Sequence, residues 1–288
     1  MKIGIIGLGN MGSRMAEKLS KSGVEVFGFD AIAEKVDSGI KSGMLKGVLD
    51  DETVSGIAHF IISLPTENSI TEILNSMNFS EGTVIIDMST VSMYFSKLNH
   101  QKMIERNIRY IDAPVIGMPA GIGSWTIPVG GEKGHYESAL PFLKFLGKNI
   151  EYMGSSGSGS LIKILNNMIS LSAWATISEV VVIADKMGID LKQLYNIIKS
   201  SGGGAVSLML DRIPRIAEND YKNICSVDVN IKDLEAAYSI TKEIKIPSLM
   251  VSAALNLHLM AHQSGYGNYD MNAIVLAFED FRKKHEGF

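Results

Sequence analysis

The segment Gly7-Leu8-Gly9-Asn10-Met11-Gly12 carries the clearest structural signal in this chain. It fits the pattern G-x-G-x-x-G, follows an apolar run at residues 2–7 that is typical of a β-strand, and opens a helical pattern at residues 11–22. A glycine-rich turn at this place brings the backbone N–H groups of a helix N-terminus close to a pyrophosphate. The segment therefore predicts a dinucleotide site, although a plain strand–turn–helix without a ligand has the same pattern.

An acidic residue, Asp30, ends the next strand-like run, at about the spacing from the glycines that dinucleotide-binding proteins show. A carboxylate there accepts hydrogen bonds from the adenosine ribose and repels a 2′-phosphate, and no arginine follows at residues 31–33. The sequence therefore predicts NAD as the cofactor. NADP stays an alternative because Lys35 is close in sequence, and a solvated acid at a strand end is the other interpretation of Asp30.

Short apolar runs rich in β-branched residues alternate with helical patterns through the first half of the chain. Strands that are separated by helices imply right-handed crossovers and a parallel sheet. We therefore expect an α/β fold whose N-terminal part is a Rossmann-type, doubly wound parallel sheet. The expected strands are residues 2–7, 24–30, 60–64, 84–88, 108–112, 125–130 and 150–153.

The pattern changes after the small, flexible stretch at residues 154–160. Residues 161–187 have the pattern of one long helix, and four or five further helical segments follow up to about Lys284. We therefore place a domain boundary at residue 157. Residues 1–157 are predicted to form the dinucleotide-binding domain. Residues 158–288 are predicted to form an all-helical substrate and dimerisation domain that begins with a long interdomain helix.

Composition narrows the class of protein. The 288 residues suit two domains, and a net charge of −4 without a Lys- or Arg-rich run argues against a nucleic-acid partner. The most apolar stretch, residues 166–184, contains Glu179 and many small polar residues, so we expect a buried helix and no membrane partner. The single cysteine, Cys225, allows no disulfide within the chain and no signal peptide is evident, so we expect a cytoplasmic protein.

Lys163 and Asn167 are the candidate catalytic pair. They lie four residues apart in a helical pattern, so they share one face of a helix. The neighbours at 161, 162, 164 and 165 are apolar, and such surroundings remove solvent from an ammonium, which lowers its pKa and suits it to proton transfer. The residues alone leave open that Lys163 is an ordinary lysine whose stem packs on a buried helix while its ammonium reaches solvent.

The whole chain resembles the β-hydroxyacid dehydrogenase family, the group of 3-hydroxyisobutyrate dehydrogenase and the glyoxylate and tartronate semialdehyde reductases. Four motifs carry the resemblance, in the order that the family has them. The first is the glycine motif at residues 7–12, and the second is Asp112-Ala113-Pro114-Val115-Ile116-Gly117-Met118, which is similar to the family's substrate loop. The third is the segment at residues 157–167, which is similar to the family's catalytic helix G-x-G-x-x-x-K-x-x-N-N. The fourth is Lys232-Asp233-Leu234.

This resemblance implies a 6-phosphogluconate dehydrogenase-like fold and an NAD(P)-dependent dehydrogenase that acts on CH–OH groups. It implies hydride transfer between NAD and a small 3-hydroxy acid similar to 3-hydroxyisobutyrate, or the corresponding semialdehyde. Lys163 would be the acid–base residue and Asn167 its partner, and no metal would be needed. The family also implies a homodimer or a homotetramer.

The same resemblance assigns further residues to the cofactor and to the substrate. Besides the glycine motif and Asp30, the residues implied for the cofactor are Leu64, Pro65, Asn68, Thr90 and Lys232. Those implied for the substrate are Ile116, Gly117, Met118, Lys163 and Asn167.

The substrate loop departs from the family's usual D-A-P-V-S-G-G. Ile116 stands where serine is expected and Met118 stands where the second glycine is expected. Ile116 removes a hydroxyl and Met118 adds a side chain, although the backbone N–H groups of Gly117 and Met118 are still able to bind a carboxylate. We therefore expect a substrate more apolar than glycerate or tartronate semialdehyde.

Three alternatives accompany these expectations. One is a reductase of a non-carboxylate aldehyde or an imine, which Lys163 disfavours because imine-reducing relatives usually have another residue there. Another is a dinucleotide-binding module without turnover, which the retained Lys163, Asn167 and Lys232 disfavour. The third is a metal site at His258 and His262, which are four residues apart, but no acid lies between them in an H-E-x-x-H pattern and no third ligand is evident.

Overall fold

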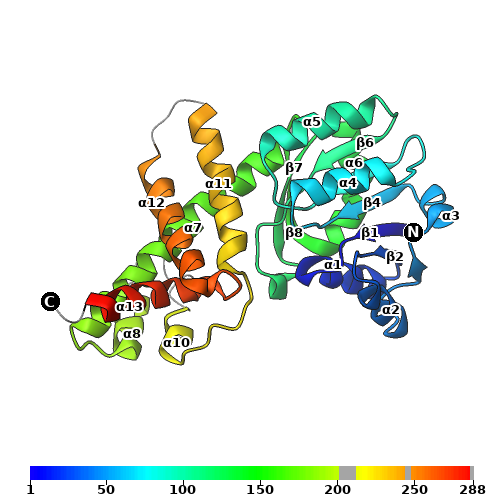
Figure 1. Ribbon diagram of the computed structural model, residues 1–288. Helices are drawn as coiled ribbons and strands as arrows, with labels where there is room; N and C mark the ends of the chain where they lie inside the picture. The colour runs from blue at the N-terminus through cyan, green and yellow to red at the C-terminus, as the bar shows by residue number, and fades with distance from the viewer. Residues whose placement is uncertain (201–211, 244–247, 286–288) are drawn as a thin grey trace. The chain divides into compact units, whose positions relative to one another are not determined.

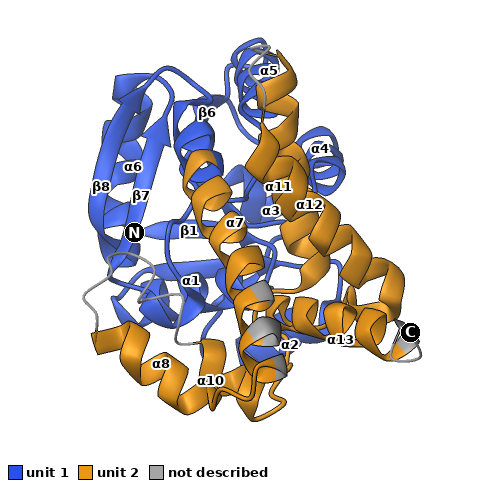
Figure 2. Cartoon of the chain, turned by 90° about the vertical axis from the view of Figure 1, so that its left-hand side faces the viewer, with its two compact units in different colours: residues 1–164 blue, residues 165–288 orange. Residues whose placement is uncertain are grey.

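Figure 1 shows the chain as a computed structural model, which describes residues 1–200, 212–243 and 248–285. The chain forms two compact units, Met1–Ile164 and Leu165–Phe288, which are drawn in blue and orange in Figure 2. The predicted domain boundary at residue 157 lies just before helix α7 (Ser158–Lys186). This helix is continuous through the border between the two units.

The first unit is built on one sheet with the strand order β3-β2-β1-β4-β5-β6-β7-β8 (Figure 1). Strands β1 to β6 pair in parallel, and the chain reverses its direction of travel across the sheet between β3 and β4, so the expected doubly wound α/β fold is confirmed. This order places a topological switch point between β1 and β4. The strands are β1 Lys2–Ile6, β2 Glu25–Phe29, β3 Gly47–Val48, β4 His59–Ile62, β5 Val84–Asp87, β6 Arg109–Asp112, β7 Trp125–Gly130 and β8 Gly147–Gly154.

Two features of the sheet differ from what the sequence pattern predicts. The pattern misses β3, because two residues are too few to show an alternation. Strand β7 is antiparallel to β6, and only β8 is parallel to β7. The connection between β6 and β7 contains a single 3₁₀ turn, η1 (Pro119–Gly121), and a parallel neighbour needs a longer crossover, usually a helix.

Helices cover both faces of the sheet because successive residues of a central strand point to opposite sides. Ile5 packs in one core cluster with Leu19 of α1, whereas its neighbour Ile6 packs in the other with Ile70 of α4. The helices of this unit are α1 Asn10–Lys21, α2 Ala33–Lys41, α3 Asp51–Ser55, α4 Glu67–Ser76, α5 Met93–Ile104 and α6 Lys133–Leu146.

The second unit is helical throughout its described residues, as expected. One apolar cluster joins Ile177 of α7 to Ile213 and Val275, and another joins Val227 to Ile274. No described helix is long and apolar enough to cross a membrane. Besides the larger part of α7, the unit contains α8 Leu191–Ser200, α10 Arg212–Ala217, α11 Val227–Glu243, α12 Leu249–Ala261, η2 His262–Tyr266, η3 Met271–Ala273 and α13 Ile274–His285.

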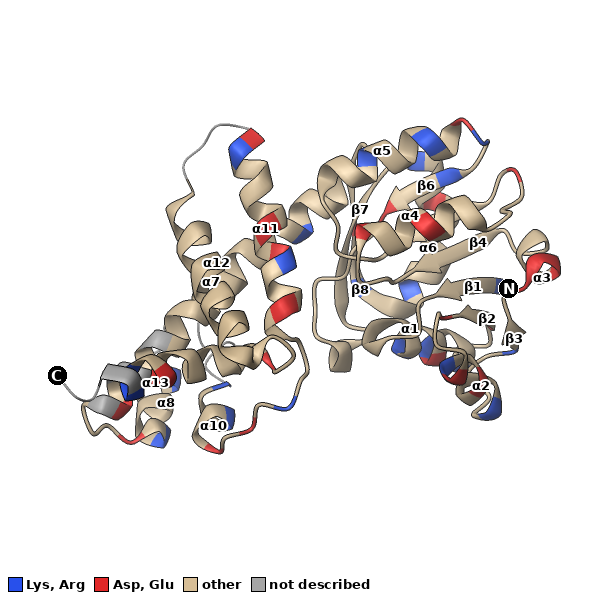
Figure 3. Ribbon diagram, in the orientation of Figure 1, with Lys and Arg blue, Asp and Glu red and all other residues tan. Residues whose placement is uncertain are grey.

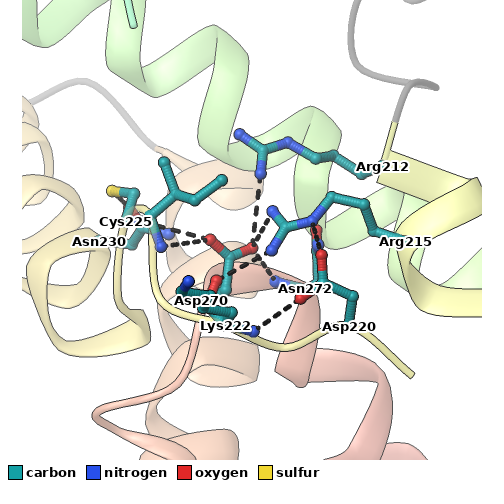
Figure 4. Close-up of polar contacts among 9 residues, drawn as sticks. Arg212, Arg215, Asp220, Lys222, Cys225, Asn230, Asp270 and Asn272 are labelled. Carbon is teal, nitrogen blue, oxygen red and sulfur yellow. Dashed lines mark hydrogen bonds and ion pairs between the residues drawn. The ribbon is translucent and has the colours of Figure 1, made fainter. Parts of the chain in front are cut away.

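A buried carboxylate, Asp270, organises the polar interior of the second unit (Figure 4). Its Oδ1 lies 3.6 Å from a guanidinium nitrogen of Arg212 and 3.4 Å from one of Arg215. Its Oδ2 accepts hydrogen bonds from the backbone N–H groups of Ile224 and Cys225, at 3.0 and 3.3 Å. These contacts hold the segment before α11 against the segment before η3, so they fix where α11 begins.

The two histidines with metal-ligand spacing lie in different surroundings. His258 is fully buried and its Nδ1 bonds to the carbonyl of Ala254, whereas His262 is exposed and pairs with Asp228 at 2.7 Å. Burial lowers the pKa of His258 to about 4, although its contact with Ala254 acts in the opposite direction. Among the described residues no cluster of metal-ligating side chains is present.

Charged residues of both signs are interspersed along single helices (Figure 3). Helix α2 carries Glu34, Lys35, Asp37 and Lys41 within its nine residues. Mixed charge of this kind is typical of a solvated helix face.

Candidate active site

The glycine-rich turn after β1 has the geometry that its sequence predicts. Gly7 has a φ of +94°, in the left-handed region that favours glycine, and its N–H donates to the carbonyl of Phe29 at 2.8 Å. A Cβ at Gly12 would collide with the backbone carbonyl of Gly7. Helix α1 therefore packs so close to β1 that only glycine fits there.

The N-terminus of α1 faces open space. A Cβ built on Gly9 would meet no atom within 4 Å, and no side chain caps the helix at this end. A cavity of about 480 Å³, within the size range of ligand pockets, is lined here by residues that include Leu8, Gly9, Asn10 and Lys35. The uncapped N–H groups and the helix dipole favour an anion, so these residues fit the pyrophosphate of a dinucleotide.

Asp30 lies beside this cavity and is held by two of the residues that line it. Its Oδ2 accepts the N–H of Leu8 at 2.7 Å, and the ammonium of Lys35 lies 3.2 Å from Oδ1. The N–H of Ile32 donates to Oδ1 at 2.9 Å. Burial by itself would raise the pKa of Asp30, but the N–H groups of Ile32 and Leu8 and the Lys35 ammonium outweigh it, so the pKa lies below its ordinary value. Asp30 is therefore a charged carboxylate at neutral pH.

The other residues implied for the cofactor in this unit follow the carboxyl ends of β4 and β5. Leu64 and Pro65 lie in the short connection between β4 and α4, Asn68 is exposed in the first turn of α4, and Thr90 is half-buried after β5. The hydroxyl of Ser89 accepts the N–H of Leu64 at 3.1 Å and so ties these two strand ends together. Strands β1, β4 and β5 are parallel neighbours, so these residues lie at the same carboxyl end of the sheet as the glycine turn.

The loop at residues 112–118 is anchored by a residue whose role the sequence reasoning missed. Ile116 pairs with Thr126 of β7 through two backbone hydrogen bonds, at 2.9 and 3.1 Å. The buried indole of Trp125 donates to the carbonyl of Met118 at 2.8 Å. Gly117 packs against the same ring, since a Cβ there would lie 2.5 Å from it.

The loop presents backbone donors next to an apolar side chain. Gly117 and Met118 are exposed, and within the described residues no hydrogen bond uses their N–H groups. Met118 is 44% exposed and Ile116 is half-buried. Two N–H groups beside apolar surface are able to hold a carboxylate that carries a small apolar group.

Lys163 and Asn167 lie on α7, one turn apart, so they share a helix face as predicted. Lys163 is half-buried. The nearly buried amide of Asn167 donates to Oδ2 of Asp233 on α11 at 2.7 Å, which fixes the orientation of the amide. Lys232, next to Asp233, has its ammonium 3.6 Å from Oδ1 of the same carboxylate.

Two family models together match nearly the whole chain. Residues 2–154 match the model of the NAD binding domain of 6-phosphogluconate dehydrogenase, and residues 157–278 match the model described as NAD-binding of NADP-dependent 3-hydroxyisobutyrate dehydrogenase. The chain is 31% identical over 287 residues to 2-(hydroxymethyl)glutarate dehydrogenase of Eubacterium barkeri, with 97% of this chain and 95% of that protein covered. The chain belongs to the β-hydroxyacid dehydrogenase family.

Further relatives of this β-hydroxyacid dehydrogenase align with the chain along its length. The NAD-dependent L-serine dehydrogenase of Pseudomonas aeruginosa is 28% identical, with 96% of this chain and 98% of that protein covered. The crystal structure of a 3-hydroxyisobutyrate dehydrogenase from Salmonella typhimurium has the same fold, with a TM-score of 0.88 at 23% identity and with 96% of this chain and 99% of that chain covered. The chain is therefore an NAD(P)-dependent oxidoreductase, and the predicted 6-phosphogluconate dehydrogenase-like fold is confirmed.

Proposed function

We propose that this β-hydroxyacid dehydrogenase transfers a hydride between NAD and a small 3-hydroxy acid or its semialdehyde, with Lys163 as the acid–base residue. The observation that carries the proposal is the uncapped N-terminus of α1 beside the charged Asp30, in a chain whose loop at residues 112–118 offers two backbone N–H donors. Relatives that act on small hydroxy acids, named for serine and 2-(hydroxymethyl)glutarate, support it.

Each residue group has a separate task in this chemistry. The turn at residues 7–12, Asp30, Leu64, Pro65, Asn68 and Thr90 would hold NAD, which supplies the hydride acceptor when bound. Neutral Lys163 takes the proton of the substrate hydroxyl on Nζ during oxidation, and its ammonium returns it to the carbonyl oxygen during reduction. Asn167 would orient the lysine or the hydroxyl. A role for Lys232 in cofactor binding stays a prediction from the family resemblance.

We further propose that the pocket favours a substrate with an apolar group. Ile116 stands where the family usually has a serine, and Met118 stands where it usually has a glycine. Both differences make the loop that would hold the carboxylate less polar than the family's usual loop. One methylene that fits such a pocket changes kcat/KM by about tenfold or more. A homodimer or homotetramer and a cytoplasmic location also stay predictions from the sequence.

The first test is a set of initial rates followed at the absorbance band of reduced nicotinamide. With NAD, we expect kcat/KM for 3-hydroxyisobutyrate to exceed that for D-glycerate by about tenfold or more. An Ile116→Ser/Met118→Gly double variant should shift the preference toward D-glycerate. A wild-type preference for D-glycerate would contradict the apolar pocket. If no acid or semialdehyde reacts although NAD binds, the proposed function fails in favour of a non-carboxylate substrate or a binding module.

The choice of NAD over NADP is tested at Asp30. An Asp30→Asn variant should lower kcat/KM with NAD and raise it with NADP, so that their ratio changes by about tenfold or more, because charge-assisted hydrogen bonds to the ribose are lost and Lys35 is released toward a phosphate. Asp37→Asn on the exposed side of α2 makes the same charge change away from the cavity and is the control. An equal ratio in wild type and Asp30→Asn would count against this role of Asp30.

A further inference from the structure

A second buried carboxylate, Asp112, lies at the carboxyl end of β6 and takes no part in the proposed proton transfer. It is fully buried, and both of its oxygens accept hydrogen bonds from the start of α7. The N–H of Gly157 donates to Oδ1 at 2.7 Å and the N–H of Ser160 donates to Oδ2 at 2.8 Å. The hydroxyl of Ser156 adds a longer contact of 3.5 Å to Oδ1.

These contacts make Asp112 the N-terminal cap of α7, although Asp112 belongs to strand β6 and not to the segment before the helix. The first N–H groups of a helix have no partner within the helix, and a negative charge beside them is favoured by the helix dipole. The first turn of α7 contains no acidic residue of its own. Asp112 therefore provides the negative charge that this turn lacks.

Glycines allow this close approach. A Cβ on Gly130 of β7 would lie 2.7 and 2.8 Å from the two carboxylate oxygens of Asp112. A Cβ on Gly159 would lie 2.6 Å from the backbone carbonyl oxygens of both Asp112 and Pro128. The end of β6 and the first turn of α7 are thus packed with no free space between them, so the turn is unable to shift without moving the strand.

The position of Asp112 joins two parts of the proposed site. Lys163 lies three residues after Ser160, so it belongs to the turn that directly follows the capped one. The backbone of Asp112 continues into the loop at residues 113–118, which begins with the N–H of Ala113 donating to the carbonyl of Asp87 at 2.7 Å. One residue therefore starts the proposed substrate loop and caps the helix that carries the proposed acid–base residue.

We propose that Asp112 is a positioning residue for the reaction, which holds Lys163 at a fixed place relative to the substrate loop by capping α7 through Gly157 and Ser160. The inference rests on the proposed role of Lys163. A carboxylate is required because it accepts from two N–H donors at once, whereas an amide would turn its NH₂ group toward one of them. Burial raises the pKa of Asp112, and the N–H groups of Gly157 and Ser160 oppose this rise.

The experiment combines Asp112→Asn with Lys163→Ala in a double-mutant cycle. Asp112→Asn should lower kcat about 100-fold with little change in KM for NAD, because a shift of about 1 Å at the reacting groups has an effect of this size while the glycine turn is untouched. In the Lys163→Ala background the same substitution should cost nothing further, since Asp112 would act only through the lysine. Additive losses of activity would overturn the proposal.

Asp87→Asn is the matched control, because Asp87 is the register partner of Asp112 on β5 and is equally buried. Its carboxylate accepts the hydroxyl of Tyr110 at 2.6 Å and the N–H of Ser89 at 2.9 Å. Both variants should lower the melting temperature, but only Asp112→Asn should shift the pH dependence of kcat that reports Lys163. A shift of that pH dependence in Asp87→Asn as well would reduce Asp112 to a structural role.

A second variant keeps the test decisive if Asp112→Asn does not fold. Gly130→Ala retains the carboxylate but displaces it from the start of α7, so it should reproduce the loss of kcat and the changed pH dependence. Normal kcat and pH dependence in Gly130→Ala would overturn the proposal. If Lys163→Ala by itself retains full activity, the proposed function fails. If Lys163→Ala is inactive but Asp112→Asn has normal kcat, only the inference about Asp112 fails.

Discussion

Replacement of Lys163 by alanine is expected to lower kcat by about 10²- to 10⁴-fold, the usual contribution of a general acid–base residue. The affinity for NAD should not change, because Lys163 is on α7 and the cavity at the glycine turn is lined by the turn, by α1, by Lys35 of α2 and by Met44. Oxidation of the hydroxy acid by the wild type should become faster as the pH rises, because the neutral amine is the base. Reduction should become slower over the same range, because the ammonium is the acid.

Steady-state rates in both directions over a range of pH, together with NAD binding followed by fluorescence, provide the measurement. Lys163→Arg should be as inactive as the alanine variant, because a guanidinium keeps its charge but does not release its proton at accessible pH. The control is Lys21→Ala, which removes a lysine that is 72% exposed at the far end of α1. A Lys163→Ala enzyme with wild-type rates and an unchanged pH profile is incompatible with the proposed mechanism.

Replacement of Asp270 by alanine is expected to lower the stability of the second unit by about 3–5 kcal/mol, which corresponds to a decrease in melting temperature of about 10 °C. The carboxylate is fully buried and Arg212, which is nearly buried, would be left without this counter-charge. The N–H groups of Ile224 and Cys225 would lose their acceptor as well (Figure 4). Removal of one member of a buried ion pair costs more than the pair itself contributes.

Asp220→Ala is the matched control, because it removes the other carboxylate that binds Arg215. That contact is short, 2.8 Å, but the Asp220 side chain is 45% exposed, so water replaces the lost carboxylate. Differential scanning calorimetry should therefore show a large decrease for Asp270→Ala and a small one for Asp220→Ala. Equal decreases in melting temperature for the two variants would mean that burial does not determine how much the ion pairs of Asp270 contribute to stability.

Much of the fold is predictable from the sequence because its signals are local. The β-branched runs, the glycine turn and the helical patterns each extend over a few residues, and together they indicate a doubly wound sheet before a helical second half. The antiparallel β7 is not predictable in this way, since its direction depends on the path of residues 113–124. The two residues of β3 are recruited by pairing with β2 and carry no pattern of their own.

The candidate site likewise contains features with a local sequence signal and contacts without one. The glycine turn at residues 7–12, the acid at position 30 and the pairing of Lys163 with Asn167 on one helix face are predictable from the sequence, because spacing along a strand or helix fixes which residues are neighbours. Three contacts become visible only in the folded chain: Trp125 anchors the loop at residues 112–118, Asp112 caps α7 and Asp233 orients Asn167. The last two contacts join residues 45 and 66 positions apart. No periodicity relates such residues, and each contact exists only because packing removes both partners from water, so that a buried donor and a buried acceptor must find each other.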